Sequence, residues 1–249
     1  MMNNSALVIL SGGQDSTTCL FWAKQKFDTV RAITFDYGQR HRIELEAAKV
    51  IAQMADVEHE IISMEGILLS TSPLLSNEEL DQYQDAQQME RTVGDRIEKT
   101  FVPMRNALFL TIAVNRALAY KCDNIIIGIS EEDSANYPDC TNIFLDNFCQ
   151  LARTALNSDG TRYSIIAPLL NKTKAETVKL AHAIPGCWEA LAYTHTSYDG
   201  KYPPTDKNHA NILRAKGFEE AGLPDPLVVR AWREGLMELP ETANYAGLT

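Results

Sequence analysis

The residues best suited to chemistry lie near the N-terminus, in a segment that reads Ser11-Gly12-Gly13-Gln14-Asp15-Ser16-Thr17-Thr18. It follows a short apolar run and precedes a helical pattern. Glycines let the chain turn tightly, so that N–H groups and the partly positive start of the helix face an anion. Since neither Walker A nor Gly-x-Gly-x-x-Gly is present, the segment predicts another kind of phosphate-binding loop. The simpler alternative is a strand-to-helix turn capped by Asp15 or Ser16.

Charged residues elsewhere could complete such a site. Asp15 repels phosphate unless its carboxylate binds Mg²⁺ or caps the helix, so we expect one of those roles. Asp36 follows the second apolar run, where α/β sheets place ligand groups, although Asp-Tyr-Gly equally suits a plain turn. Arg40, Arg105 and Lys174 could neutralise phosphate charge. Each alone is more often a surface residue, but together, at the ends of successive strand-helix units, they favour a site.

A loop after the fourth apolar run holds Glu131, Asp133, Tyr137 and Asp139. Carboxylates can accept hydrogen bonds from the donor edge of a guanine-like base, and an aromatic ring can stack on its face. A plain surface loop of this composition would need no such explanation. Cys140 has no neighbouring histidine in the sequence to activate its thiol, so we expect it to pack or to line a pocket.

These residues must be positioned by a layered fold. Short, β-branched apolar runs occupy residues 7–10, 30–35, 60–62, 124–129 and 164–167. Amphipathic stretches lie between them, at residues 17–25, 41–54, 106–120, 143–156 and 174–183. This alternation predicts an α/β fold with a doubly wound, Rossmann-like parallel sheet and helices on both faces. The candidate residues would then gather at the carboxyl ends of the strands.

Two stretches interrupt the alternation. Residues 70–99 are polar and acidic, and we expect a mobile or partly helical insertion near the site that orders on ligand binding. From residue 193 the chain is rich in Pro, Gly and Asn, and helical patterns resume at residues 212–221 and 228–237. We therefore predict a nucleotide-binding domain over residues 1–192 and a small C-terminal helical appendage over residues 193–249.

Composition narrows the class of protein. The chain has 249 residues and a formal net charge of −10, which argues against nucleic acid or anionic lipid as a partner. No segment approaches the roughly 20 apolar residues of a membrane span, and the first apolar run lacks the basic flank of a signal peptide. We expect a cytoplasmic protein. Five cysteines without a Cys-x-x-Cys pair argue against a disulfide framework.

The Ser-Gly-Gly-x-Asp-Ser segment resembles the signature of the PP-loop ATP pyrophosphatases, adenine nucleotide alpha hydrolase-like enzymes that cleave ATP between its α and β phosphates. Five further segments extend the resemblance to the 7-cyano-7-deazaguanine synthase (QueC) family over nearly the whole chain. They are residues 35–41, 101–106, 128–140, 187–196 and 213–218. Met104 stands where that family usually has glycine, which predicts a changed pocket shape near Arg105.

The resemblance implies a fold, ligands and site residues. ATP and Mg²⁺ would be the cofactors, a deazapurine the substrate, and a homodimer the assembly. Catalysis would fall to Asp15, Ser16, Arg105 and Lys174. The nucleotide would contact Leu10, Ser11, Gly12, Gly13, Gln14, Asp15, Ser16, Thr17, Thr18, Asp36 and Arg40. The deazapurine would contact Tyr37, Gln39, His41, Arg105, Asn106, Gly128, Glu131, Asp133, Tyr137, Pro138 and Asp139.

The sequence departs from that family near its C-terminus. Family members bind a structural zinc through four cysteines, and those positions here are Ser197, Thr205, Asn208 and Asn211. Hydroxyl and amide oxygens are poor zinc ligands, and His209 alone cannot hold the ion. We therefore predict no zinc. The loop over residues 198–211 would instead be held by side-chain hydrogen bonds to the backbone, by its two prolines, or by a partner.

Two enzymatic functions agree with the resemblance. In the first, the carboxylate of 7-carboxy-7-deazaguanine is adenylated, ammonia gives the amide, and a second ATP gives 7-cyano-7-deazaguanine (preQ0) for queuosine synthesis. In the second, as zinc-free relatives in defence gene clusters imply, the activated deazaguanine is transferred to another amine, such as a protein N-terminus. A nucleotide-binding module without catalysis is weaker, because the phosphate loop and the later motifs are intact.

Overall fold

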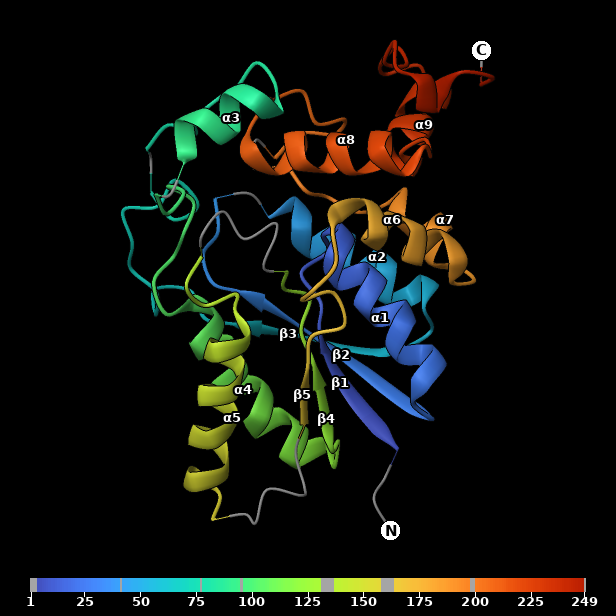
Figure 1. Ribbon diagram of the computed structural model, residues 1–249. Helices are drawn as coiled ribbons and strands as arrows, with labels where there is room; N and C mark the ends of the chain where they lie inside the picture. The colour runs from blue at the N-terminus through green and yellow to red at the C-terminus, as the bar shows by residue number, and fades with distance from the viewer. Residues whose placement is uncertain are drawn as a thin grey trace.

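The computed structural model describes residues 4–40, 42–76, 78–94, 96–130, 137–157, 164–197 and 200–248. One sheet runs through it, with every strand parallel to its neighbours, in the order β3-β2-β1-β4-β5. The strands are β1 (Ser5–Ile9), β2 (Thr29–Asp36), β3 (Glu58–Ser63), β4 (Asn124–Ile126) and β5 (Ser164–Ile166). This order confirms the predicted doubly wound sheet, in which the direction of winding reverses between β1 and β4 (Figure 1).

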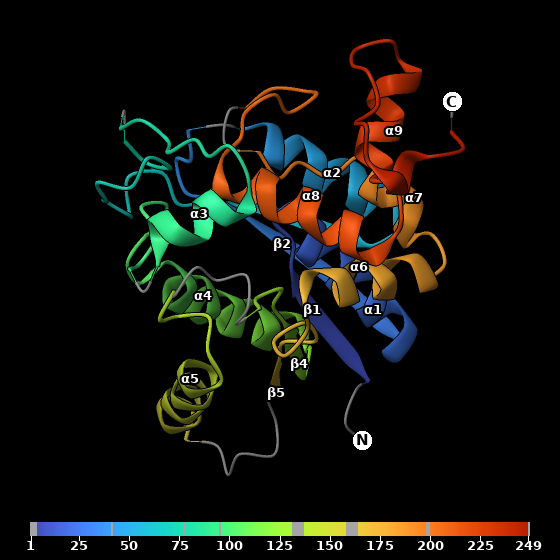
Figure 2. The ribbon, with the colours of Figure 1, turned by 45° about the horizontal axis from the view of Figure 1, so that its top comes forward.

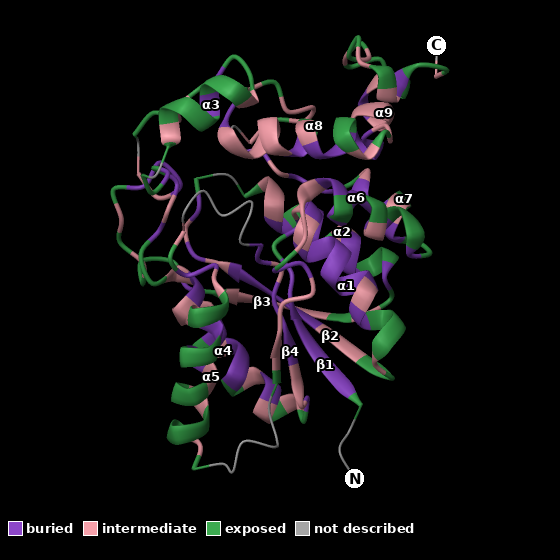
Figure 3. Ribbon diagram, viewed as in Figure 1, coloured by how far each residue is buried: buried purple, intermediate pink, exposed green. Residues whose placement is uncertain are grey.

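Helices cover both faces of the sheet. On one face lie α1 (Gln14–Lys26), α2 (Ile43–Met54), α6 (Lys174–Ala183) and α7 (Cys187–Leu191), and on the other lie α4 (Arg105–Tyr120) and α5 (Asn142–Ala155) (Figure 1). The central strand β1 serves both cores, because Ala6 and Val8 face the first set of helices whereas Leu7 and Ile9 face the second. Alternate side chains of a strand point to opposite faces. The strand is therefore buried throughout, as Figure 3 shows.

The C-terminal segment and the insertion lie together at one end of the sheet. The segment forms α8 (His209–Ala221), α9 (Pro226–Arg233) and a short 3₁₀ turn (Ala243–Tyr245), and the insertion contributes α3 (Ala86–Val93). Helix α3 lies beside α8 in both views (Figures 1 and 2), and Lys216 Nζ is 2.9 Å from Glu90 Oε1. Part of the insertion is thus helical, and its mobility and its ordering on ligand binding stay predictions. Within the described residues, no helix is long and apolar enough to cross a membrane.

Close packing of α8 on α6 depends on one glycine. A Cβ atom at Gly217 would lie 2.2 Å from Cγ and 2.9 Å from Cβ of Lys174. No side chain fits at such a separation, so glycine lets α8 rest directly on the stem of Lys174. This contact fixes the start of α6 and, with it, a cation of the site described below.

Candidate active site

The predicted phosphate loop joins the end of β1 to the start of α1. Its hydroxyl groups form a cluster, in which Ser11 Oγ lies 2.9 Å from Ser16 Oγ and the Thr17 hydroxyl donates to the Gly13 carbonyl at 2.8 Å. The N-cap of α1 is Gly13, and no side chain in the described part of the chain caps this helix. The alternative of a turn capped by Asp15 or Ser16 is therefore wrong. The uncapped N–H groups of the first helical turn remain available for an anion.

Gly12 fixes the loop against α2. Its φ angle is +88°, and a Cβ there would lie 2.3 Å from the Glu44 carbonyl oxygen and 2.9 Å from Ala48 N. Only glycine satisfies both conditions without strain. On the other side of the loop, the His195 N–H donates to the Gly12 carbonyl at 2.9 Å. The C-terminal segment thus contributes directly to the position of the loop.

The end of β4 approaches the same loop. A Cβ at Gly128 would lie 2.9 Å from Ser16 N and 3.1 Å from the Asp15 carbonyl carbon. The candidate site therefore lies between the carboxyl ends of β1 and β4, which is the position where the winding of the sheet reverses. Ligands of open α/β sheets bind at such positions.

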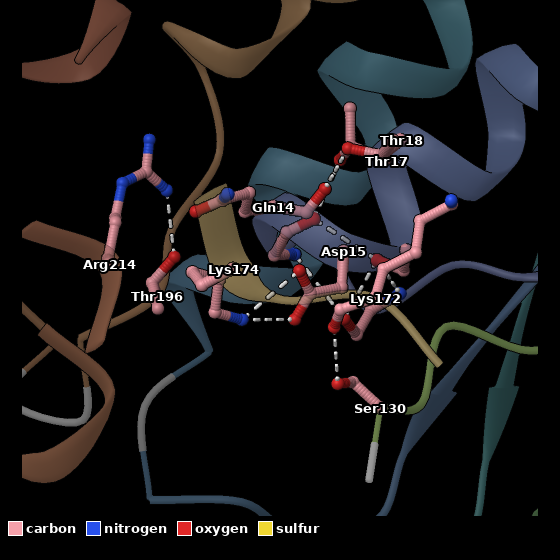
Figure 4. Close-up of polar contacts among 12 residues, drawn as sticks. Gln14, Asp15, Thr17, Thr18, Ser130, Lys172, Lys174, Thr196 and Arg214 are labelled. Carbon is pink, nitrogen blue, oxygen red and sulfur yellow. Dashed lines mark hydrogen bonds and ion pairs between the residues drawn. The ribbon is translucent and has the colours of Figure 1, made fainter. Parts of the chain in front are cut away.

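Asp15 and Lys174 face one another across the loop (Figure 4). Lys174 Nζ lies 3.0 Å from Asp15 Oδ2 and 3.3 Å from Asp15 Oδ1. Lys174 is the first residue of α6, whose start is fixed by a capping box between Thr173 and Glu176. Asp15 does not cap α1. Its carboxylate is instead compensated by the lysine, which reduces its repulsion toward a phosphate bound at the loop.

Two adjoining cavities open around the loop. The first, of about 270 Å³, extends toward α4 and has apolar walls that include Phe35, Phe109 and Ile127. The second, of about 210 Å³, extends toward α6 and α8 and is lined by polar residues that include His209. The two cavities share Ser11, Asp15, Ser16, Glu44, Gly128 and Tyr137. A ligand can therefore place a phosphate at the loop and an aromatic group in the first cavity.

Most predicted site residues line these cavities. Those that line the first cavity are Leu10, Ser11, Asp15, Ser16, Tyr37, Gln39, Arg105, Asn106, Gly128 and Tyr137. Three further predicted residues, Gly13, Gln14 and Lys174, line the second cavity. Gln14 is buried, and its Nε2 has no hydrogen-bond partner among the described residues. A buried donor beside a phosphate loop is suited to a ligand oxygen.

Other predicted residues lie beside the cavities rather than in them. Thr17 and Thr18 bond carbonyls within their own helix. Asp36 is bound by the Arg42 guanidinium at 2.8 Å. Arg40 is exposed and its N–H donates to the Leu74 carbonyl, which places it toward the insertion.

The loop after β4 is described only in part. Pro138 is exposed, whereas Asp139 is buried and its carboxylate accepts the Asn106 N–H at 3.4 Å, at the start of α4. Asp139 thus supports the helix that carries Arg105 and is absent from the cavity lining. His41, Glu131 and Asp133 lie outside the described residues.

Cys140 lines the first cavity, as the sequence allowed. Burial, together with the nearby Asp139 carboxylate, raises the pKa of its thiol to about 12. A thiol with so high a pKa is a poor nucleophile at neutral pH. The expectation of a packing or pocket-lining role is therefore supported.

Met104 occupies the position where glycine was expected. Its φ angle is +64°, a left-handed conformation that favours glycine, and its side chain is 68% exposed. The side chain does not line either cavity. The side chain projects into solvent, so Met104 does not contribute directly to the lining of these cavities, and a changed pocket shape near Arg105 stays a prediction.

Sequence reasoning missed Glu44, in the first turn of α2. Glu44 lines both cavities. Burial raises its pKa from 4.5 to about 7, although the Arg105 guanidinium lowers it. Nothing in the sequence separates Glu44 from Glu46 in the same helical turn. Only the contact of α2 with Gly12 shows which of the two faces the site.

Three of the four positions that correspond to the family's zinc ligands surround the Asp206 carboxylate. Ser197 Oγ, Asn208 Nδ2 and Asn211 Nδ2 all donate to the Asp206 side chain, and Asn211 Nδ2 also donates to the Asp206 carbonyl at 3.1 Å. Amide and hydroxyl donors that surround an acceptor do not form a zinc ligand set. In the described part of the chain, no three or more His, Cys, Asp or Glu residues are placed to hold a metal ion.

Arg214 connects this C-terminal segment to the phosphate loop. Its guanidinium binds the Asp225 carboxylate at 2.6 and 2.8 Å and donates to the hydroxyls of Thr194 and Thr196, each at 2.8 Å. Both members of the ion pair are 4% exposed. These threonines flank His195, whose N–H binds the loop. Figure 4 shows the Arg214–Thr196 contact beside Lys174.

Comparison with known proteins agrees with this site. Residues 5–222 match the sequence model of the family described as "Queuosine biosynthesis protein QueC". A relative from Gloeobacter violaceus is 44% identical over 225 residues, covering 89% of this chain and 94% of that protein. One from Laribacter hongkongensis is 44% identical over 226 residues, with coverage of 90% and 94%. Both are named 7-cyano-7-deazaguanine synthase. The chain described here therefore belongs to the QueC family.

Proposed function

We propose that the protein is an ATP-dependent ligase-type enzyme that converts 7-carboxy-7-deazaguanine, through the amide, to 7-cyano-7-deazaguanine. The observation that carries this proposal is the phosphate loop with its Lys174–Asp15 pair, which opens into an aromatic cavity lined by Arg105. Family membership and the names of the relatives support the same chemistry.

ATP would bind with its phosphates at the loop. Ser11, Ser16 and the first N–H groups of α1 would bind phosphate oxygens, and Lys174 would add positive charge. Asp15 fits a role in holding Mg²⁺, because this ion often takes one or two carboxylates together with phosphate oxygens. When bound, the ion would stabilise the charge of the departing pyrophosphate.

The deazapurine would occupy the first cavity. Phe35 and Phe109 stack with ring centroids 4.3 Å apart, and they form a flat apolar wall suited to a heterocycle. Arg105 lies with its guanidinium carbon 6.0 Å from the centre of the Tyr37 ring. Its charge suits the substrate carboxylate. Glu131 and Asp133 remain our candidates for reading the donor edge of the base.

Adenylation would proceed by attack of a substrate carboxylate oxygen on the α phosphorus, with release of pyrophosphate. Cations fixed around the loop stabilise the charge that develops in this step. The mixed anhydride then carries AMP, a far better leaving group than hydroxide, so that ammonia can displace it to give the amide. A second adenylation of the amide oxygen, followed by loss of AMP, would give the nitrile.

The proposal is tested by incubating the protein with Mg-ATP, 7-carboxy-7-deazaguanine and ammonium, and identifying products by mass spectrometry. We expect AMP, pyrophosphate, the amide and the nitrile. An adenylate without amide or nitrile would favour transfer to another amine, such as a protein N-terminus. Absence of both AMP and adenylate would contradict the proposal. Size measurement of the same preparation tests the proposed homodimer.

A further inference from the structure

Glu44 differs in its surroundings from the other carboxylate shared by the two cavities. Among the described residues that line both, Asp15 and Glu44 are the acidic ones. Asp15 is held by Lys174. Within the described part of the chain, the Glu44 carboxylate makes no hydrogen bond or ion pair. It is thus the shared carboxylate that can exchange a proton with a ligand in the site.

The groups around Glu44 come from every element that borders the two cavities. They are Asp15 of α1, Tyr37 after β2, Arg105 of α4, Tyr137 and Cys140 after β4, Lys174 of α6, His195 after α7, and His209 and Arg214 of α8. Burial raises the pKa of the Glu44 carboxyl to about 7, and Arg105 opposes this rise only in part. At neutral pH the group is therefore poised between its protonated and ionised forms, as suits a general base.

The neighbouring titratable groups are less suited to accept a proton. Burial raises the pKa of both Tyr37 and Tyr137, so their hydroxyls remain protonated at neutral pH. His195 and His209 line the second cavity but not the first. Glu44 lies where the proposed acyl group and phosphate would meet, which is where a nucleophile must enter.

We propose that Glu44 accepts the proton from the amine nitrogen when the activated acyl group is converted to the amide. This inference rests on the proposed function. The ammonia nitrogen forms a bond to the acyl carbon, and the carbon–oxygen bond to AMP breaks with its electron pair passing to the AMP phosphate oxygen. The nitrogen loses one proton, which Glu44 takes, so that neutral amide, AMP and a protonated carboxyl result.

The test compares Glu44→Gln with Glu46→Gln, which changes an exposed acid in the same helical turn. Adenylate formation and amide formation are measured separately in a single turnover by rapid quench. We expect Glu44→Gln to release pyrophosphate within a few-fold of the unmodified protein, but to form amide about 10²-fold more slowly. Glu46→Gln should match the unmodified protein in both steps.

A second nucleophile distinguishes proton transfer from a structural role. Hydroxylamine is already unprotonated at neutral pH and is more nucleophilic than ammonia, so it depends less on a base. We expect it to restore product formation, as hydroxamate, in Glu44→Gln. At a fixed concentration of free ammonia, amide formation by the unmodified protein should rise with pH and level off above about 7. The variant should lack this rise.

Several outcomes would overturn the inference. They are amide formation by Glu44→Gln at the unmodified rate, an unchanged pH profile, or loss of adenylate formation together with amide formation in a folded variant. Failure of the proposed function is distinct, because the unmodified protein would then form no adenylate. If Glu44→Gln does not fold, Glu44→Asp is used. It should keep the pH-dependent rise at a reduced rate, and absence of that rise would also overturn the inference.

Discussion

Lys174 Nζ lies 3.0 Å from the carboxylate of Asp15, although the two residues are 159 positions apart in the sequence. The pair brings the start of α6 to the start of α1. Gly217 makes this possible, because it lets α8 press on the stem of Lys174. A cation of the site is therefore positioned by the packing of the C-terminal helices, which links that segment to the phosphate loop.

Removing this cation should slow ATP cleavage strongly but leave the fold intact. In Lys174→Met, Asp15 would lie uncompensated beside the phosphates, and we expect pyrophosphate release to fall by about 10²- to 10³-fold. Lys179→Met, at an exposed position of the same helix, is the matched control. Pyrophosphate release is measured alongside thermal melting. Near-normal release by the folded Lys174 variant would contradict our assignment of the loop.

The two glycines Gly12 and Gly222 provide a matched test of the loop geometry. Both have positive φ, but a Cβ at Gly12 would meet α2 backbone atoms at 2.3 and 2.9 Å, whereas a Cβ at Gly222 would meet nothing within 4 Å. Gly222→Ala should therefore cost about 1 kcal/mol of unfolding free energy, from backbone strain alone. Gly12→Ala should cost several times more, or prevent folding. Chemical denaturation measures both, and equal losses would be inconsistent with the contact to α2.

The sheet could be predicted from the sequence because each buried strand leaves its own pattern in a short, continuous stretch of residues. Strand β1 is buried on both faces, and its residues 6–9 are apolar without interruption. The amphipathic stretches that follow mark the helices. The phosphate loop was also predictable, since its glycines and hydroxyls are contiguous. The predicted nucleotide contacts of Asp36 and Arg40 stay predictions. Whether Asp36 faces a ligand or the guanidinium of Arg42 depends on side-chain geometry that spacing does not determine.

The C-terminal segment shows a similar limit. The four positions at which family members have cysteine were found by alignment, and the prediction of side-chain hydrogen bonds was correct in kind. We expected these side chains to donate to backbone carbonyls, but their main hydrogen-bond acceptor is the Asp206 carboxylate. No pattern of spacing identifies that residue, because it becomes central only when Ser197 and Asn211 are brought together in space.

Asp206 should stabilise this segment without metal. Asp206→Ala would leave the buried donors of Ser197 and Asn208 without their acceptor. We expect the free energy of unfolding to fall by about 3 kcal/mol and the melting temperature to fall by about 6–12 °C. Lys207→Ala, at the exposed neighbouring position, should have little effect. Differential scanning calorimetry of the two variants measures the difference, and similar melting temperatures would refute a central role for Asp206.

Metal analysis tests whether the same segment binds zinc. We expect the purified protein to hold less than one zinc per chain, because Ser197, Thr205, Asn208 and Asn211 provide no thiolate. A chelator should leave the melting temperature unchanged, since no folding free energy would come from the ion. One tightly held zinc per chain, or a chelator-induced fall in melting temperature, would show that other ligands have replaced the cysteines.

Glu44 should make the stability of the protein depend on pH. Burial raises the pKa of its carboxyl from 4.5 to about 7 in the folded state. Between these two values the folded state binds a proton that the unfolded state does not, so stability falls as pH rises through this window. Above about pH 7 the carboxyl is ionised in both states and the full cost of burying its charge is present. We expect this cost to lower the free energy of unfolding by about 1–3 kcal/mol.

The comparison of Glu44→Gln with the unmodified protein measures this cost directly. Glutamine has nearly the same shape but never ionises, so the variant should be more stable at pH 8 and nearly equal at pH 5. The control Glu46→Gln concerns an exposed carboxylate paired with Lys49 and should show no such gain at pH 8. Denaturant unfolding of all three proteins at both pH values provides the measurement. A Glu44→Gln variant that is no more stable at pH 8 would mean that the carboxylate is well solvated, which would also remove the electrostatic basis for its role as a base.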